Sequence, residues 1–424
     1  MAADDMTPKA APDHRLIGLA HLLIALIAGA GASGLAAALR FGWIEGSAGA
    51  IAAHGVLMTF FVTLPALFGG IAALALPAEI GARGPALPRM AHLALWLHAL
   101  GVAGAGAAVL TASLPVGLGA LAMVGLSGSL SAINVITTFV VARRRPAAEV
   151  PVLGWSLLIT ACVLLAALPV VSAAAVLLAA GIGRPAALWL DAGGDVAALR
   201  GVLWFYGQPE LFAMLLPGFG IIAHVTERAT GRALPARTAF VGLLAIVAAL
   251  GTILWMQQSF AGTLPMDGFL ALAPRLAALP ALMLAGLVLM VLRGAALGLP
   301  MAWGMAALAL MATGAVTTLL GGTEPARFHY VVALASAFAL FAAFYLWLPE
   351  ITGRALPARS AWVQFGLIAL GTVLGWAPGA FGSNGTVPAQ IGTGLSVAGL
   401  ALFLVSAGLA LRPLLARGWA LRRA

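Results

Sequence analysis

Residues 152–180 read VLGWSLLITACVLLAALPVVSAAAVLLAA and contain no charged side chain. About 20 apolar residues in a helix are enough to cross a hydrocarbon core ~30 Å thick. Similar runs recur along the chain, in which 62% of the 424 residues are hydrophobic and only 8% are charged. A soluble domain carries charge on about a quarter of its residues, so this chain lacks the polar surface that water requires. The sequence therefore predicts an all-α integral membrane protein.

Twelve transmembrane helices are predicted, separated by turns rich in Gly and Pro such as GIGRPA and GSNGTVPAQ. We treat residues 1–424 as one transmembrane domain. Residues 1–14 are expected to form a polar cytoplasmic tail, since they lack the layout of a cleaved signal peptide. The predicted helices are 16–39, 51–76, 90–113, 117–141, 152–180, 199–224, 238–260, 273–292, 300–321, 328–349, 361–380 and 389–411.

The distribution of basic residues predicts the orientation. Twelve spans place both termini on one side, and 17 of the 22 Lys and Arg residues then fall on that side, against 5 on the other. The positive-inside rule makes the richer side cytoplasmic. The net charge of +9 is thereby explained by the loops, and no nucleic-acid partner is expected. The Ala- and Arg-rich composition, with almost no Lys, indicates a GC-rich bacterium and hence its inner membrane. The single Cys162 excludes internal disulfides and iron–sulfur ligation within the chain.

Two histidines are predicted at one depth near the outer side. His54 opens the second span and His329 opens the tenth. Two imidazoles on different helices can hold one haem iron from opposite faces. The alternative is that each intramembrane imidazole bonds to a neighbouring carbonyl. The other five histidines are interpreted as structural or interfacial: His14, His21, His92, His98 and His224.

Four long motifs resemble subunit I of the haem-copper oxidases, the cytochrome c oxidase subunit I-like proteins. They are HGVLMTFFVTLPALFGG (54–70), SAINVITTF (131–139), WFYGQPELFAMLLPGFGIIAHV (204–225) and RFHYVVALASAFALFAAFYLWLPEITGR (327–354), in the family's order and spacing. The resemblance implies a twelve-helix bundle. It also implies that His54 and His329 are the axial ligands of one low-spin haem, of type a or b.

The oxygen-reducing centre of that family does not carry over. Its three copper-binding histidines correspond to Gln208, Gln257 and Gln258. A carboxamide is a poor ligand for copper, so no copper is expected. The axial ligand of the high-spin haem corresponds to Arg327, whose guanidinium has no lone pair for iron. The tyrosine beside the copper corresponds to Phe212.

The family's proton routes are also incomplete. The channel lysine corresponds to Leu284, and the Asp and Asn of the other channel correspond to Gly84 and Ala73. Glu210 remains at the position of the internal proton relay and is interpreted as a relic.

The arginines that bind haem propionates in the family also have changed. The basic pair that would follow the eleventh helix is missing. Arg40 stands where the family has an arginine beside the low-spin haem. Arg40 and Arg327 are therefore possible haem neighbours, and the alternative for both is an interfacial anchor.

Three functions follow in order of preference. The first is a membrane subunit with one bis-histidine haem, for electron transfer or structure, and no oxygen chemistry. The second is a cofactor-poor structural or assembly subunit, and the third is a working terminal oxidase with substitute ligands. The resemblance implies partners in a respiratory complex: subunits like oxidase subunits II and III, and a c-type cytochrome, besides membrane lipid.

Overall fold

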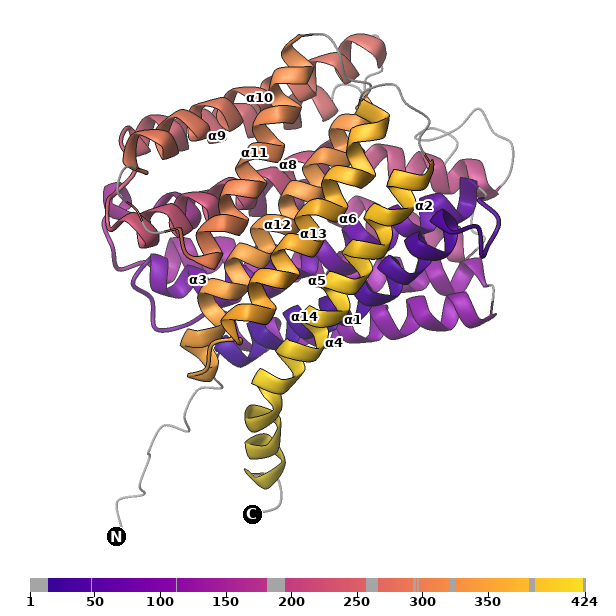
Figure 1. The fold of residues 1–424 in the computed structure, drawn as a ribbon, viewed down its shortest axis with the longest axis horizontal. Helices are drawn as coiled ribbons and strands as arrows, with labels where there is room; N and C mark the ends of the chain where they lie inside the picture. Colours follow the sequence, from indigo (N-terminus) through magenta and orange to yellow (C-terminus); the bar gives the residue numbers. More distant parts are fainter. Residues whose placement is uncertain are drawn as a thin grey trace.

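A computed structural model of the chain describes residues 14–421, apart from 47, 112, 181–194, 257–265, 293–294, 296, 321–324 and 381–385. All regular structure within these residues is helical. Twelve long helical segments result, and their helices run side by side in one bundle (Figure 1). The start of α1 and the end of α14 lie at the same end of this bundle. The predicted all-helical class is confirmed.

The helix bounds agree with the predicted spans to within about four residues, except that α8 and α14 end later and α10 begins earlier than predicted. The chain runs through α1 (His14–Arg40), α2 (Ala48–Val56), the π-helices η1 (Leu57–Thr63) and η2 (Pro65–Ile71), α3 (Ala72–Glu79), α4 (Pro88–Thr111), α5 (Leu114–Thr137), η3 (Thr138–Ala142), η4 (Ala147–Glu149), α6 (Val152–Ala179), α8 (Asp195–Thr230), α9 (Arg237–Met256), α10 (Met266–Val291), α11 (Leu299–Leu319), α12 (Pro325–Thr352), α13 (Ala358–Ala380) and α14 (Thr386–Leu421). The second predicted span is thus one continuous helical segment made of α2, η1, η2 and α3.

Eight segments of the described chain are long and apolar enough to cross a membrane. Two further apolar stretches, Arg237–Ile253 and Arg275–Val291, are shorter. A multi-pass membrane protein is therefore confirmed, and the count of twelve spans stays a prediction.

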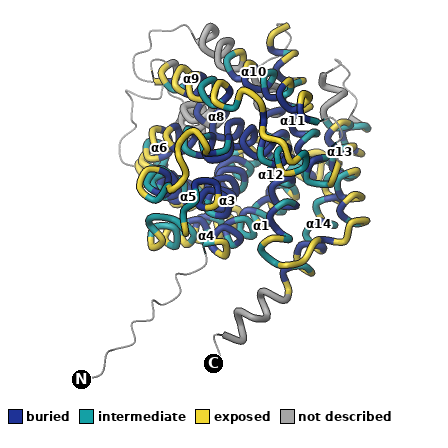
Figure 2. The backbone as a smooth tube through the Cα atoms, turned by 90° about the vertical axis from the view of Figure 1, so that its left-hand side faces the viewer, coloured by how far each residue is buried: buried dark blue, intermediate teal, exposed yellow. Residues whose placement is uncertain are grey.

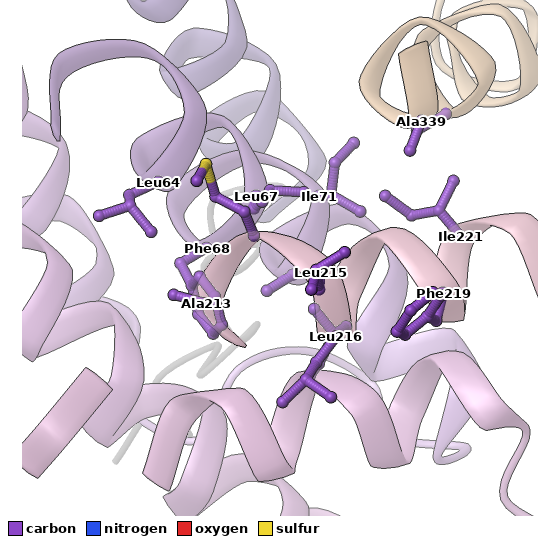
Figure 3. Packing of buried hydrophobic residues seen from close by; sticks show 14 of the residues in the cluster. Leu64, Leu67, Phe68, Ile71, Ala213, Leu215, Leu216, Phe219, Ile221 and Ala339 are labelled. Carbon is purple, nitrogen blue, oxygen red and sulfur yellow. The ribbon is translucent and has the colours of Figure 1, made fainter. Parts of the chain in front are cut away.

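The second span lies at the centre of the bundle. In its apolar window, 72% of the residues are buried, against 17% in α4 at the periphery. Buried residues gather in the middle of the molecule and exposed ones on outer helices such as α9 and α14 (Figure 2). Figure 3 shows Leu67 and Ile71 of this span beside Leu215 of α8, and Ala339 of α12 near Ile221 of α8. A helix that is apolar on all sides is one that other helices surround.

Pro65 explains why the second span is not a regular α-helix. Proline has no backbone N–H, so it cannot donate to the carbonyl four residues earlier. The chain winds as a π-helix on both sides of this interruption, over Leu57–Thr63 and Pro65–Ile71. Such irregular turns are frequent near functional sites.

Candidate functional site

A large cavity between the helices has a volume of about 340 Å³. Its walls come from α1 and the second span, early in the sequence, and from α12, α13 and α14, late in the sequence. Most of the lining is apolar, including Met58, Phe338, Phe341 and Phe403. Concave, mostly apolar sites with a few polar groups are typical of cofactor pockets.

Small residues from α1, α13 and α14 line part of this cavity. On α1 they recur at helical spacing, and on α13 and α14 they meet at a close helix crossing. They are Ala25, Gly29, Ser33 and Ala36 on α1, and Gly371, Gly375, Gly392 and Ser396 on α13 and α14. Walls with short side chains leave room for a broad, flat ligand between helices.

His54 lies in the wall of the cavity with a defined tautomer. Its Nδ1 is 3.0 Å from the carbonyl oxygen of Ala32 on α1. A carbonyl only accepts, so Nδ1 carries the proton and donates. In the neutral ring Nε2 then keeps its lone pair. Metal-binding histidines commonly have their second nitrogen bonded in this way.

Arg40 lines the same cavity at the end of α1. Apart from His54, it is the only ionisable residue among the described residues that line the cavity. One cationic side chain in an otherwise neutral, apolar wall favours a ligand with an anionic group.

Another wall belongs to α12, which carries His329 and Arg327 in its first turns. The side chains of both residues lie outside the described part of the structure. Leu334, Phe338, Phe341 and other residues further along α12 line the cavity. The predicted pairing of His54 with His329 remains a prediction.

Of the three positions that correspond to the family's copper-binding histidines, one is in α8 and two follow α9 in the sequence. Gln208 and Glu210 belong to α8, but their side chains are outside the described residues, as are Gln257 and Gln258 altogether. Phe212 is buried at 1% exposure. A β-carbon at Gly251 of α9 would lie 2.2 Å from its ring, so the ring fills the space between the two helices.

The positions of the lost proton routes are apolar or small. Leu284 is fully buried. Ala73 lines a cavity of about 40 Å³, whose wall also contains His21, Ser131 and Asn134. Gly84 lies beside His14.

The structure also brings together two histidines that the sequence analysis treated separately. The Nδ1 atoms of His21 on α1 and His98 on α4 lie 3.1 Å apart, and both side chains are buried. The imidazole planes are stacked at 13°. No local sequence signal relates positions 77 residues apart, so only the packing of α1 on α4 reveals the pair.

The fold is that of a multi-pass membrane protein with a large, mostly apolar cavity between its helices. A family model described as cytochrome C and quinol oxidase polypeptide I matches residues 16–405. The chain therefore belongs to the family of subunit I of the haem-copper oxidases. The family normally binds haem and works with other subunits in an oxidase complex.

One curated relative is the cytochrome c oxidase subunit 1 of Cereibacter sphaeroides, 29% identical over 375 residues. The match covers 77% of this chain and 66% of that protein. The chain thus spans slightly less than two thirds of its relative's length.

Proposed function

We propose that the chain is a haem-binding membrane subunit that holds one low-spin haem between His54 and His329 and does not reduce oxygen. The observation that carries this proposal is His54. Its protonated Nδ1 is fixed on the Ala32 carbonyl, 3.0 Å away, in the wall of a cavity of about 340 Å³. This arrangement leaves Nε2 as a ligand for iron.

The register of α12 supports His329 as the second ligand. Position 329 precedes Leu340 by eleven residues, which is about three helical turns. Leu340 lines the cavity. The two positions therefore share one side of α12, which supports His329 as the second ligand.

The charge of the cavity also fits a haem. A ferric haem with two neutral imidazole ligands has one net positive charge on its core and two propionate carboxylates. One arginine balances that sum, and Arg40 is available in the wall. Arginine and carboxylate form strong charge-assisted hydrogen bonds. We assign Arg40 to a propionate.

A haem with two imidazole ligands has no open coordination position and supplies one-electron transfer. The residues at the copper and high-spin haem positions support the absence of oxygen chemistry. Gln208, Gln257 and Gln258 replace imidazoles, and Arg327 replaces the iron ligand. Phe212 has no phenolic hydroxyl and packs against Gly251.

The setting of the subunit is proposed from the charge pattern and the family. We place it in a bacterial inner membrane as a single domain of twelve spans with both termini in the cytoplasm. Subunits like oxidase subunits II and III, and a c-type cytochrome, are the proposed partners. They would supply or accept the electron, because the chain has no second redox centre in this proposal.

Optical spectroscopy of the purified protein tests the proposal. We expect one haem per chain, with spectra of the oxidised and dithionite-reduced protein typical of two imidazole ligands and unchanged by carbon monoxide. His54→Ala and His329→Ala should each lose the haem. His92→Ala is the control, since His92 is on the exposed side of α4 and bonds only to its own helix at Pro88.

The other outcomes distinguish the alternatives. A colourless protein would favour a structural subunit. A second haem that binds carbon monoxide would restore a gas-binding enzyme and refute the proposal.

A further inference from the structure

The helix that carries His54 is interrupted close to this residue. Phe61 lies seven residues after His54, and its carbonyl lacks the α-helical donor because residue 65 is proline. Both flanking stretches are π-helical. The segment therefore needs contacts from other helices to fix its winding.

His98 of α4 supplies one such contact. Its Nε2 lies 3.1 Å from the Phe61 carbonyl oxygen, so Nε2 carries a proton and donates. In the neutral ring, Nδ1 of His98 is then an acceptor. It faces Nδ1 of His21 at 3.1 Å, which must be the donor of that bond. The tautomers of both rings are thereby determined.

The site is shaped for the ring of His21. A β-carbon at Gly69 of η2 would lie 2.3–2.5 Å from three atoms of the imidazole, so only glycine permits this approach. His21 and His98 are 1% and 0% exposed. The two rings therefore lie in a fitted site between α1, α4 and the second span, which neighbour one another in the bundle.

Hydrogen bonds connect α1, α4 and the second span, and one of them is made by the proposed haem ligand His54. His98 connects Phe61 of the second span to His21 of α1. Eleven residues further along α1, the Ala32 carbonyl accepts from Nδ1 of His54. The bridge of two hydrogen bonds through His98 and the direct bond between His54 and Ala32 thus tie α1 to the helix of His54 at two levels, about 16 Å apart along α1.

We propose that His21 and His98 are positioning residues for the haem ligand His54. The inference rests on the proposed function. The pair fixes the position of α1 relative to the interrupted second span. That position sets how far along α1 the His54 ring lies and how its ring plane is oriented. Neither imidazole touches the ligand cavity near His54, so their effect is transmitted through the two helices.

The hydrogen bonds of His21 and His98 can be removed or kept one at a time by substitution. His98→Leu removes the donor to the Phe61 carbonyl and the acceptor of the His21 N–H in a buried site, where a lost hydrogen bond is costly. His98→Gln keeps one donor and one acceptor on a side chain of similar reach. His92→Leu, on the exposed side of the same helix, is the matched control.

The decisive readout is the electron paramagnetic resonance spectrum of the ferric haem, whose g values depend on the angle between the two imidazole planes. We expect shifted g values and about tenfold weaker haem binding in His98→Leu. His98→Gln and His92→Leu should keep the wild-type spectrum. Hydrogen exchange of residues 54–71 should become faster in His98→Leu, with α11 unaffected.

A merely structural role gives a different result. His98→Leu would then yield less protein, but the surviving holoprotein would have wild-type g values, and this result would overturn the inference. If His98→Leu does not accumulate, His21→Leu decides the question, because it breaks the tie to α1 and keeps the donor of the Phe61 carbonyl. A wild-type chain without haem would refute the proposed function as well, whereas unchanged g values refute only this inference.

Discussion

His54 and His92 show why a hydrogen bond alone does not define a ligand. Each donates from Nδ1 to a backbone carbonyl, at 3.0 Å to Ala32 and 2.9 Å to Pro88. His92 bonds within its own helix on the exposed side of α4, whereas His54 bonds across to α1 and lines the large cavity. The hydrogen bond from His54 to α1 fixes the imidazole ring in the wall of the large cavity. Its free Nε2 can therefore bind a ligand in that cavity.

Arg40 provides the prediction at the scale of single residues. Arg40→Gln removes the positive charge opposite the proposed propionate, so we expect about tenfold faster loss of haem to apomyoglobin in detergent. Arg40→Lys should recover most of the retention, because it restores the charge without the bidentate geometry. Equal retention in Arg40→Gln and wild type would show that the propionates bind elsewhere.

At the scale of elements, the second span combines π-helical winding with close contacts to α1. Its π-helical turns lack the regular α-helical ladder, yet Gly69 and Gly70 bring it very close to α1. The absence of a β-carbon at position 69 makes room for His21. Close approach through glycine is how helices gain packing energy within a membrane.

Gly69→Ala tests this contact. The added methyl group would overlap the His21 ring, so α1 and η2 must separate. We expect a loss of about 2 kcal/mol in the free energy of unfolding, measured by denaturation in mixed micelles. Gly31→Ala on α1 is the matched control, since a β-carbon there meets no atom within 4 Å. Ala has a higher helix propensity than Gly, so Gly31→Ala should not destabilise α1. A loss in this control equal to that in Gly69→Ala would show that overlap with His21 is not the cause.

The same span shows what the sequence could and could not predict. Its existence followed from length and apolarity, and the position of His54 followed from its place at the start of the run. The π-helical winding depends on Pro65 together with donors from α4, which the local pattern does not contain. The His21–His98 pair depends on the packing of two helices, so it needed the structure. His54 alone of the predicted ligand pair has a described side chain, and the pairing with His329 stays a prediction.

At the scale of the whole molecule, the arrangement of charge and helices predicts which loops face which side. The first loop holds Glu45, and the loop between α5 and α6 holds Glu149; both side chains are exposed. Three helical segments lie between the two loops, so the loops fall on opposite sides of the membrane if every segment crosses it.

Cysteine labelling checks this orientation. In a Cys162→Ala background, Glu45→Cys should react with an impermeant maleimide in intact spheroplasts. Glu149→Cys should react only after the membrane is opened, because the positive-inside rule makes its loop cytoplasmic. The reverse pattern would invert the proposed orientation, and equal reactivity would contradict the predicted spans between the two positions.

The walls of the large cavity come from the beginning and the end of the chain, since α1 packs against α14 and both line it. During synthesis, α1 and the second span enter the membrane long before α13 and α14 exist. A partly made chain that lacks α13 and α14 therefore has only part of the cavity wall. If the proposed haem is bound, we expect it to be retained only after these two helices have entered the membrane.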